Sequence, residues 1–398
     1  MARAAPRVGD SHNFGRRVRV AGERVVKPRT VLWEWLVLSP QSPLRRALAR
    51  AAAESELGRE AFEFLPRLKF WRWRGQPGGE VERLSLAPLP RTRATREELA
   101  QVLGRALALF SWLGLADLHW ENLALGAGPG GRVVFGPLDI ELMLADLALP
   151  TETKLLPDAD PEYAEICRHA AGARRALPWL GKPIAPADLL RMVLHYRATL
   201  ELLSRHAPAL ARAIASVPQL KEAPLRVLLR GTEEYVRTPE HQLWPPLLEA
   251  EREQLERGDV PYFFRLYGRA GIHYFTEPSL VRRGRLPLHG DVPQLDPILS
   301  LSKHLRSPKR EKLLRDGVMA VLAAFDHPSL NGRQQHAGLA VTFGARSLVV
   351  RLPNGEELRS RRDLRAFVGS LYLPCRCGET RAVLVPPVTV CRAAPRSV

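Results

Sequence analysis

The stretch that decides the fold of this chain is "GLADLHWENLALGAGPGGRVVFGPLDIEL", residues 114–142. Asp117 and Asn122 stand five positions apart in it, and two short apolar runs separated by a Gly-rich turn lead to Asp139 and Glu141. The apolar runs predict strand, turn and strand. Carboxylate and amide oxygens are hard ligands that suit magnesium. The stretch therefore combines metal-seeking and proton-accepting groups with a predicted strand, turn and strand that end at Asp139.

This spacing is typical of a phosphoryl-transfer centre. Protein kinases use a loop Asp, an Asn five residues later and a metal-binding Asp beyond a short hairpin. Asp117, Asn122 and Asp139 follow that order. Short motifs also occur by chance, so a polar surface loop followed by an unrelated Asp is the alternative.

An ATP site also needs a cation from an upstream strand, and Lys27 in "ERVVKPRT" ends an apolar strand where it can reach phosphates. Taken alone, Lys27 would be an ordinary surface residue. The preceding "GDSHNFGRRV" brackets a polar loop with Gly9 and Gly15 and contains Asp10 and His12. Such a turn brings backbone N–H groups close to phosphate.

Apolar periodicity and turn residues predict the remaining elements. A hairpin is expected around Gly22, and a small β-rich unit with an "NG" turn is expected after residue 335. Helices are expected over 43–65, over 95–113 with Thr95 as N-cap and Gly114 just past the end, over 186–217 with a break near Pro208, and before Gly258.

The predicted fold class is α+β, with four regions. Residues 1–93 are an α+β N-terminal region, and residues 94–275 are a mainly helical catalytic region. Residues 276–334 are a linker with helices, and residues 335–398 are the small β-rich unit.

Composition limits the function classes. The 59 Lys and Arg residues against 42 Asp and Glu give a net charge of +17, but the basic residues are mostly Arg spread along the chain. We therefore expect no nucleic-acid partner; an acidic peptide or a nucleotide suits the charge equally well. No apolar run can span a bilayer, and the first residues have no secretory apolar core. Four Cys suggest no disulfide framework, so a cytoplasmic location is expected.

Six segments resemble, in order, the dehydratase domain of class II lanthipeptide synthetases: "GDSHNFGRRV", "VVKPRT", "GLADLHWENLALG", "LDIEL", "RVLLRGTEEY" and "EQLERGDVPYF". The resemblance covers about residues 8–265. It implies a two-lobed, kinase-like core related to lipid kinases. It also implies ATP- and magnesium-dependent phosphorylation of Ser and Thr in a precursor peptide, followed by phosphate elimination to dehydroamino acids.

The resemblance assigns the phosphorylation half to one group of residues. Lys27 would contact nucleotide phosphates and Asp117 would orient or deprotonate the substrate hydroxyl. Asn122 and Asp139 would hold Mg²⁺. The same motifs also contain two supporting positions, His119 and Glu141.

The elimination half corresponds to Asp10, His12, Arg226 and Thr232. Arg226 and Thr232 would stabilise and expel the phosphate, because a guanidinium neutralises a phosphate bidentately. The sequence does not identify the base that removes the α-proton. The alternatives are ordinary: Arg226 pairing with an acid on a helix, His12 capping a turn, and Thr232 capping a helix.

The chain departs from the family in two ways. "GDSHN" begins at residue 9, so either the start lies further upstream or the family's preceding peptide-recognition elements are absent. No fused cyclase with its zinc site is expected in these residues; Cys375, Cys377 and Cys391 lack the spacing and a fitting His, and are expected to be structural or incidental. Partners would be a precursor peptide, with or without an acidic leader, and a separate cyclase. A kinase that stops at the phosphopeptide and an idle peptide-binding scaffold are the alternatives.

Overall fold

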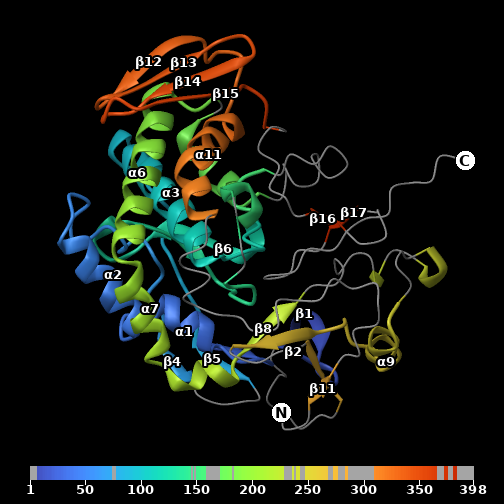
Figure 1. Cartoon of the computed structure of the whole chain (residues 1–398). Helices are drawn as coiled ribbons and strands as arrows, with labels where there is room; N and C mark the ends of the chain where they lie inside the picture. The colour runs from blue at the N-terminus through green and yellow to red at the C-terminus, as the bar shows by residue number, and fades with distance from the viewer. Residues whose placement is uncertain are drawn as a thin grey trace, which may run out of the picture.

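A computed structural model describes residues 7–73, 78–144, 147, 149–157, 171–181, 183–227, 235–236, 239–242, 247–267, 272–276, 283–285, 309–364, 372–374 and 380–382. Helices combine with several small antiparallel sheets, which confirms the α+β class (Figure 1). Within these ranges, no helix has both the length and the apolar character that a membrane crossing requires.

The N-terminal region forms a five-stranded antiparallel sheet in the order β1-β2-β3-β5-β4. The predicted hairpin around Gly22 is confirmed: Ala21 pairs with Arg24, and Gly22 adopts φ 60°, a left-handed turn conformation that glycine tolerates. The strands are β1 (Arg7–His12), β2 (Arg16–Ala21), β3 (Arg24–Lys27), β4 (Phe70–Arg72) and β5 (Gly79–Glu82).

Two helices follow β3 along the chain. Every residue of α1 (Leu32–Leu38) is buried, and α2 (Pro43–Ala53) begins at the N-cap Ser42. The helix predicted over 43–65 is wrong in length, because α2 ends at Ala53 and turns occupy the rest. Gly58, at φ 75°, belongs to those turns.

Two long helices lie side by side at the centre of the molecule, α3 (Arg93–Leu113) and α6 (Pro186–Arg205) (Figure 1). A Cβ at Gly104 would lie 2.1 Å from the Met192 carbonyl oxygen, so only glycine permits this close approach. The N-cap assignment of Thr95 is wrong. Thr92 is the cap, and its hydroxyl accepts the Thr95 N–H at 3.1 Å.

The predicted end of α3 and the predicted break after α6 are confirmed. Gly114 closes α3 in the left-handed conformation, with φ 66°. The chain turns at His206 and resumes as α7 (Ala207–Ala215), where Pro208 occupies the first turn, in which a helix needs no amide donor. Further short helical segments are α5 (Leu177–Leu180), η1 (Trp120–Asn122), η2 (Pro129–Gly131), η3 (Pro150–Thr153), η4 (Gly172–Ala176), η5 (Pro218–Glu222) and η6 (Glu240–Gln242).

The stretch quoted first forms the predicted hairpin, with β6 (Leu123–Ala127) antiparallel to β7 (Val133–Pro137). Its turn end is held to α3, because the Val133 N–H donates to the Glu98 carboxylate at 3.0 Å. β7 is fully buried, as its unbroken apolar sequence predicts. The open end of the hairpin carries the candidate site.

Two further sheets lie at opposite ends of the molecule (Figure 1). One is ordered β11-β10-β9-β8 and lies near α9 (Glu249–Glu256); the other, β12-β13-β14-β15, lies against α6. The strands are β8 (Pro224–Val227), β9 (Phe263–Leu266), β10 (His273–Phe275), β11 (Arg283–Arg285), β12 (Gly332–His336), β13 (Leu339–Phe343), β14 (Ser347–Arg351) and β15 (Glu357–Arg361).

The predicted β-rich unit and its Asn354-Gly355 turn are confirmed, with Gly355 at φ 86° between β14 and β15. α11 (Lys309–Ala324) precedes this sheet, and β16 (Tyr372–Pro374) pairs with β17 (Thr380–Ala382). One apolar cluster runs from α1 to β15. The division of the chain at residues 93, 275 and 334 stays a prediction.

Candidate functional site

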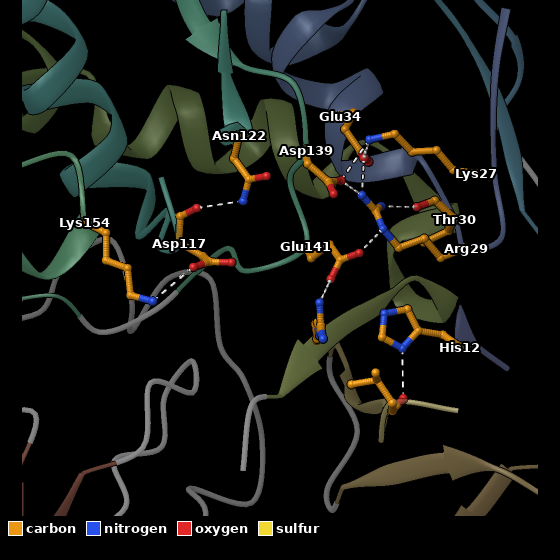
Figure 2. Close-up of polar contacts among 12 residues, drawn as sticks. His12, Lys27, Arg29, Thr30, Glu34, Asp117, Asn122, Asp139, Glu141 and Lys154 are labelled. Atoms are coloured by element: carbon orange, nitrogen blue, oxygen red, sulfur yellow. Dashed lines mark hydrogen bonds and ion pairs between the residues drawn. The ribbon is translucent and has the colours of Figure 1, made fainter. Parts of the chain in front are cut away.

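The open end of the β6–β7 hairpin gathers residues that are far apart in the chain. The Leu138 N–H donates to the Asn122 carbonyl at 2.8 Å, which fixes Asp139 beside the loop that precedes β6. The Lys27 amine, at the end of β3, lies 2.8 Å from the Asp139 carboxylate (Figure 2). Two predicted site residues separated by 112 positions therefore meet in an ion pair.

Lys27 is also held from the helix side. Its Nζ donates to Glu34 in α1 at 3.1 Å and to the Leu138 carbonyl at 3.0 Å; the Lys27 side chain is 7% exposed and that of Glu34 is 1% exposed. Burial, the largest influence, lowers the pKa of Lys27 although Glu34 opposes it. Burial opposes ionisation of Glu34 too, but Arg29 and Lys27 outweigh it and lower the pKa of Glu34.

Arg29 is a residue of this cluster that the sequence analysis missed. Its guanidinium pairs with Glu34 at 2.6 Å and also contacts Asp139 and Glu141, so it joins three carboxylates. Two signals could have revealed this group. Arg29 stands two residues after Lys27 in the same "VVKPRT" segment, and Glu34 is the only charged residue in the otherwise apolar helix "LWEWLVL".

Glu141 connects this cluster to β8. The Arg226 N–H donates to the Glu141 carbonyl at 3.1 Å, and its guanidinium donates to the Glu141 carboxylate at 2.5 Å. Burial would raise the pKa of Glu141, but Arg226, Arg29 and His12 lower it well below the ordinary carboxyl range. Arg226 also lies 5.5 Å from the Tyr262 ring, and burial followed by Glu141 raises the pKa of that phenol.

His12 stands at the end of β1, beside Tyr262 at 5.5 Å between ring centroids. Its Nδ1 lies 2.9 Å from the Val260 carbonyl. A carbonyl only accepts hydrogen bonds, so Nδ1 carries a proton in this contact.

Asp259 fixes this loop against the segment after α9. Its carboxylate accepts from the Ser11 hydroxyl at 2.7 Å and from the N–H groups of Phe14 at 2.6 Å and Gly15 at 2.9 Å. Burial opposes ionisation, yet these donors together lower the pKa of Asp259. The "GDSHN" and "GDVPYF" segments are therefore one structural unit, although Ser11 and Asp259 are 248 positions apart in the chain.

Asp117 and Asn122 lie on the other wall. Asp117 adopts φ 62°, a left-handed conformation that costs a non-glycine residue about 1 kcal/mol or more. Its carboxylate pairs with Lys154 at 3.1 Å, and the Asn122 side-chain N–H₂ donates to the Asp117 carbonyl at 2.9 Å. The Asn122 side-chain oxygen is therefore directed toward Asp139 (Figure 2).

These walls enclose a cavity of about 320 Å³. Its lining includes Asn13, which the sequence analysis missed and whose amide is 4% exposed with no hydrogen-bond partner for either atom among the described residues. Of the predicted residues, the cavity brings together His12, Asp117, His119, Asn122, Asp139, Glu141 and Arg226, and Lys27 joins them through Asp139.

The remaining predicted residues are not described at the site. Asp10 lies in β1, but its side chain is not described, and Thr232 lies outside the described residues. Cys375, Cys377 and Cys391 also lie outside them.

The predicted magnesium ligands fit an ion that is completed by phosphate oxygens and water. The Asp139 side chain is 35% exposed. Its Oδ1 is paired with Lys27 and Arg29, and its Oδ2 forms no ion pair within the described ranges. The described residues contain no cluster of three His, Cys, Asp or Glu side chains that could hold a metal by itself. Mg²⁺ commonly uses one or two carboxylates and takes its other ligands from water and substrate phosphates, so the chemistry of a carboxylate and an amide oxygen is compatible with such an ion.

No protein-family model matches this chain, and no curated protein sequence matches it.

Proposed function

We propose that this protein transfers phosphate from ATP to Ser and Thr side chains of a peptide and then eliminates the phosphate to leave dehydroamino acids, as the lanthipeptide dehydratases do. The observation that carries the proposal is the meeting of Lys27, Asp139 and Asn122 beside one cavity that Arg226 and His12 also line. A single cavity then contains groups suited to both half-reactions.

The Lys27–Glu34 ion pair supports the phosphorylation half independently of the sequence motifs. In protein kinases, a lysine on the third strand pairs with a glutamate on the next helix, and that pair positions the lysine on the nucleotide phosphates. Here the lysine ends β3, and the glutamate lies on α1, the helix that follows. A lysine fixed in this way presents its charge without the entropy cost of ordering a free side chain.

Asp117 is suited to hold the hydroxyl that is phosphorylated. Its carboxylate is 29% exposed at the cavity wall, and Lys154 balances its charge from the outer side. Asn122 and Asp139 would hold Mg²⁺, which supplies neutralisation of phosphate charge when bound. Fixed orientation of these groups before the substrate arrives contributes to catalysis, because they need not reorganise during the reaction.

Arg226 and His12 are suited to elimination. In that step the α-proton passes to a base, the electron pair of the Cα–H bond forms the carbon–carbon double bond, and the Cβ–O bond breaks with its electron pair leaving on phosphate. Nε2 of His12 can accept the proton, because Nδ1 is already protonated toward Val260. Arg226, which has an Nε with no partner among the described residues, can pair with the departing phosphate.

The experiment follows nucleotide binding and peptide mass in parallel. MgATP should raise the melting temperature of the wild type, and Asp139→Asn and Lys27→Met should remove the increase. A peptide library rich in Ser and Thr should lose one water per modified site in the wild type. Arg226→Gln should accumulate phosphopeptide instead, because phosphorylation continues without elimination.

The other possible results distinguish the dehydratase from a kinase and from a peptide-binding scaffold. Phosphopeptide from the wild type without water loss would reduce the function to a kinase. The absence of any MgATP-dependent shift in the wild type, or an equal shift in Asp139→Asn, would exclude the proposal and favour a peptide-binding scaffold. Glu240→Gln is the matched control, because its carboxylate is 54% exposed in a surface pair with Arg252 and lies outside the cavity lining.

A further inference from the structure

A second, larger hollow lies at the far ends of the same hairpins that build the cavity. It encloses about 1640 Å³ between the β2–β3 turn at Gly22, helix α2, the segment 59–67, the segment 82–86 and the β6–β7 turn. None of its lining residues lines the smaller cavity. It is called the groove below.

Arg45 is the unusual residue of the groove. Its side chain belongs to the buried face of α2, the residue is 7% exposed, and its Nη1 is buried without a hydrogen-bond partner among the described residues. No carboxylate within the described ranges pairs with it, and burial followed by the neighbouring Arg67 lowers its pKa to about 10. A guanidinium removed from water without a counter-charge is destabilising, so the groove retains a positive group that has no structural partner.

The charges around Arg45 are unequal. Six arginines line the groove against four glutamates, namely Arg45, Arg46, Arg59, Arg67, Arg83 and Arg132 against Glu23, Glu60, Glu63 and Glu82. Glu60 pairs with Arg132 at 2.6 Å, and Glu63 pairs with Arg67. Arg46, Arg59 and Arg83 are exposed and form no ion pair within the part of the chain that the structure describes. The groove therefore attracts anions around a buried cation.

The apolar lining of the groove indicates what kind of anion fits. Leu84 and Leu86 are half-buried and alternate with the exposed Arg83 and Ser85, so apolar and polar positions alternate along this segment and Arg83 supplies a positive charge. A Cβ at Gly126 would lie 2.5 Å from the Leu86 Cβ, so this segment lies directly on β6. An extended peptide whose side chains alternate between apolar and acidic matches this lining, because successive side chains of an extended chain point to opposite sides.

A nucleic acid matches the groove less well. Regularly spaced phosphates would pass beside Glu60 and Glu63, and no aromatic side chain lines the groove for a base to stack on. Inorganic phosphate would satisfy Arg45 but would leave the apolar positions uncovered. The charge and the apolar lining together favour a peptide.

We propose that the groove binds an extended acidic peptide segment, with one carboxylate of that segment paired to Arg45. This binding does not depend on phosphoryl transfer, because the groove and the cavity share no lining residue. A charged hydrogen bond at a desolvated site contributes about 1.5–3 kcal/mol, which corresponds to a loss of roughly tenfold to a hundredfold in affinity when it is removed.

The test uses fluorescence anisotropy of a labelled peptide in which Glu and Leu alternate. The wild type should bind it, and Arg45→Gln should weaken binding by about tenfold or more. Arg50→Gln is the matched control, because Arg50 is exposed on the same helix outside the groove and its loss changes the net charge equally. An oligonucleotide of equal charge, inorganic phosphate and a Gln–Leu peptide should compete poorly.

Several results would overturn the proposal: no binding by the wild type, equal weakening by Arg50→Gln, or stronger binding of the oligonucleotide than of the peptide. If Arg45→Gln does not fold, the double variant Arg59→Gln/Arg83→Gln takes its place, because both side chains are exposed and their removal leaves the core intact. Unchanged binding in that variant would also count against the proposal. MgATP binding should remain unchanged in every variant of this series.

Discussion

The β2–β3 and β6–β7 hairpins each have one end in the cavity and the other end in the groove, and the two ends treat buried charge differently. At the cavity end, Lys27, Arg29 and Arg226 are each paired with carboxylates. At the groove end, Arg45 is as deeply buried as Lys27 but has no carboxylate among the described residues.

The difference separates two uses of a buried cation. A paired cation holds its neighbours in place, and removal of one partner leaves an uncompensated charge in the interior. An unpaired buried cation does not stabilise the fold, but it can bind an anionic ligand. Substitutions at the two ends should therefore change stability in opposite directions.

The largest expected effect is on stability at the cavity end. Glu141→Gln leaves Arg29 and Arg226 with less counter-charge and should lower the free energy of unfolding by about 3 kcal/mol, measured by denaturant unfolding. Because the pKa of Glu141 is lowered, its contribution is present above the ordinary carboxyl pKa and is lost as the pH falls, so the difference from wild type should narrow in acid.

Glu356→Gln is the matched control for that prediction. Its carboxylate is 44% exposed and pairs with Arg197 at 3.4 Å, so the loss should stay below about 0.5 kcal/mol. Equal losses in the two variants would show that the charges at the cavity end are no more tightly coupled than a surface pair.

A smaller effect is expected at His195, a half-buried basic residue of α6 outside both the cavity and the groove. Burial, followed by Arg105, Arg191 and His336, lowers its pKa from 6.5 to about 4, and the Arg105 guanidinium donates to its Nδ1 at 3.3 Å. As the pH falls, His195 is therefore protonated at a higher pH in the unfolded chain than in the folded chain. The free energy of unfolding should fall by about 2 kcal/mol between pH 6.5 and a pH of about 4. His195→Gln should flatten this pH dependence of the melting temperature, and an unchanged slope would contradict the assignment.

The smallest effect has the opposite sign and is expected in the groove. Arg45→Met removes the unpaired guanidinium, keeps the length of the side chain, and should raise the free energy of unfolding by about 1 kcal/mol. Arg50→Met should instead lower the free energy of unfolding by about 0.3 kcal/mol. Arg50 lies in the last turn of α2, where a positive charge interacts favourably with the helix dipole. A clear loss in Arg45→Met would mean that Arg45 is structural and would remove the contrast between the two ends.

The sequence predicts the fold best where local pattern and local structure agree. The Gly22 hairpin, the Gly114 helix end and the break near Pro208 all follow from residues whose backbone preferences act over a few positions. The helix expected over 43–65 fails because good helix formers continue past Ala53, while the tertiary structure requires turns there.

The site is only partly readable from sequence for a related reason. Motif spacing identified Lys27, Asp117 and Asp139, but Arg29 and Glu34 acquire their roles only when β3, α1 and the hairpin meet. No sequence motif indicates the groove, because its arginines come from four separate segments of the chain. Ion pairs between distant segments depend on topology, which periodicity does not encode.

The length of the β6–β7 hairpin has a consequence for any substrate that uses both of its ends. Five residue pairs separate Asn122 and Asp139 from the turn at Gly128, a span of roughly 15 Å. A peptide anchored at one end could not deliver a hydroxyl to the other with fewer than about five extended residues between anchor and reactive position. The length of the hairpin would set the shortest distance along the peptide between the acidic segment bound in the groove and the first Ser or Thr that can be modified.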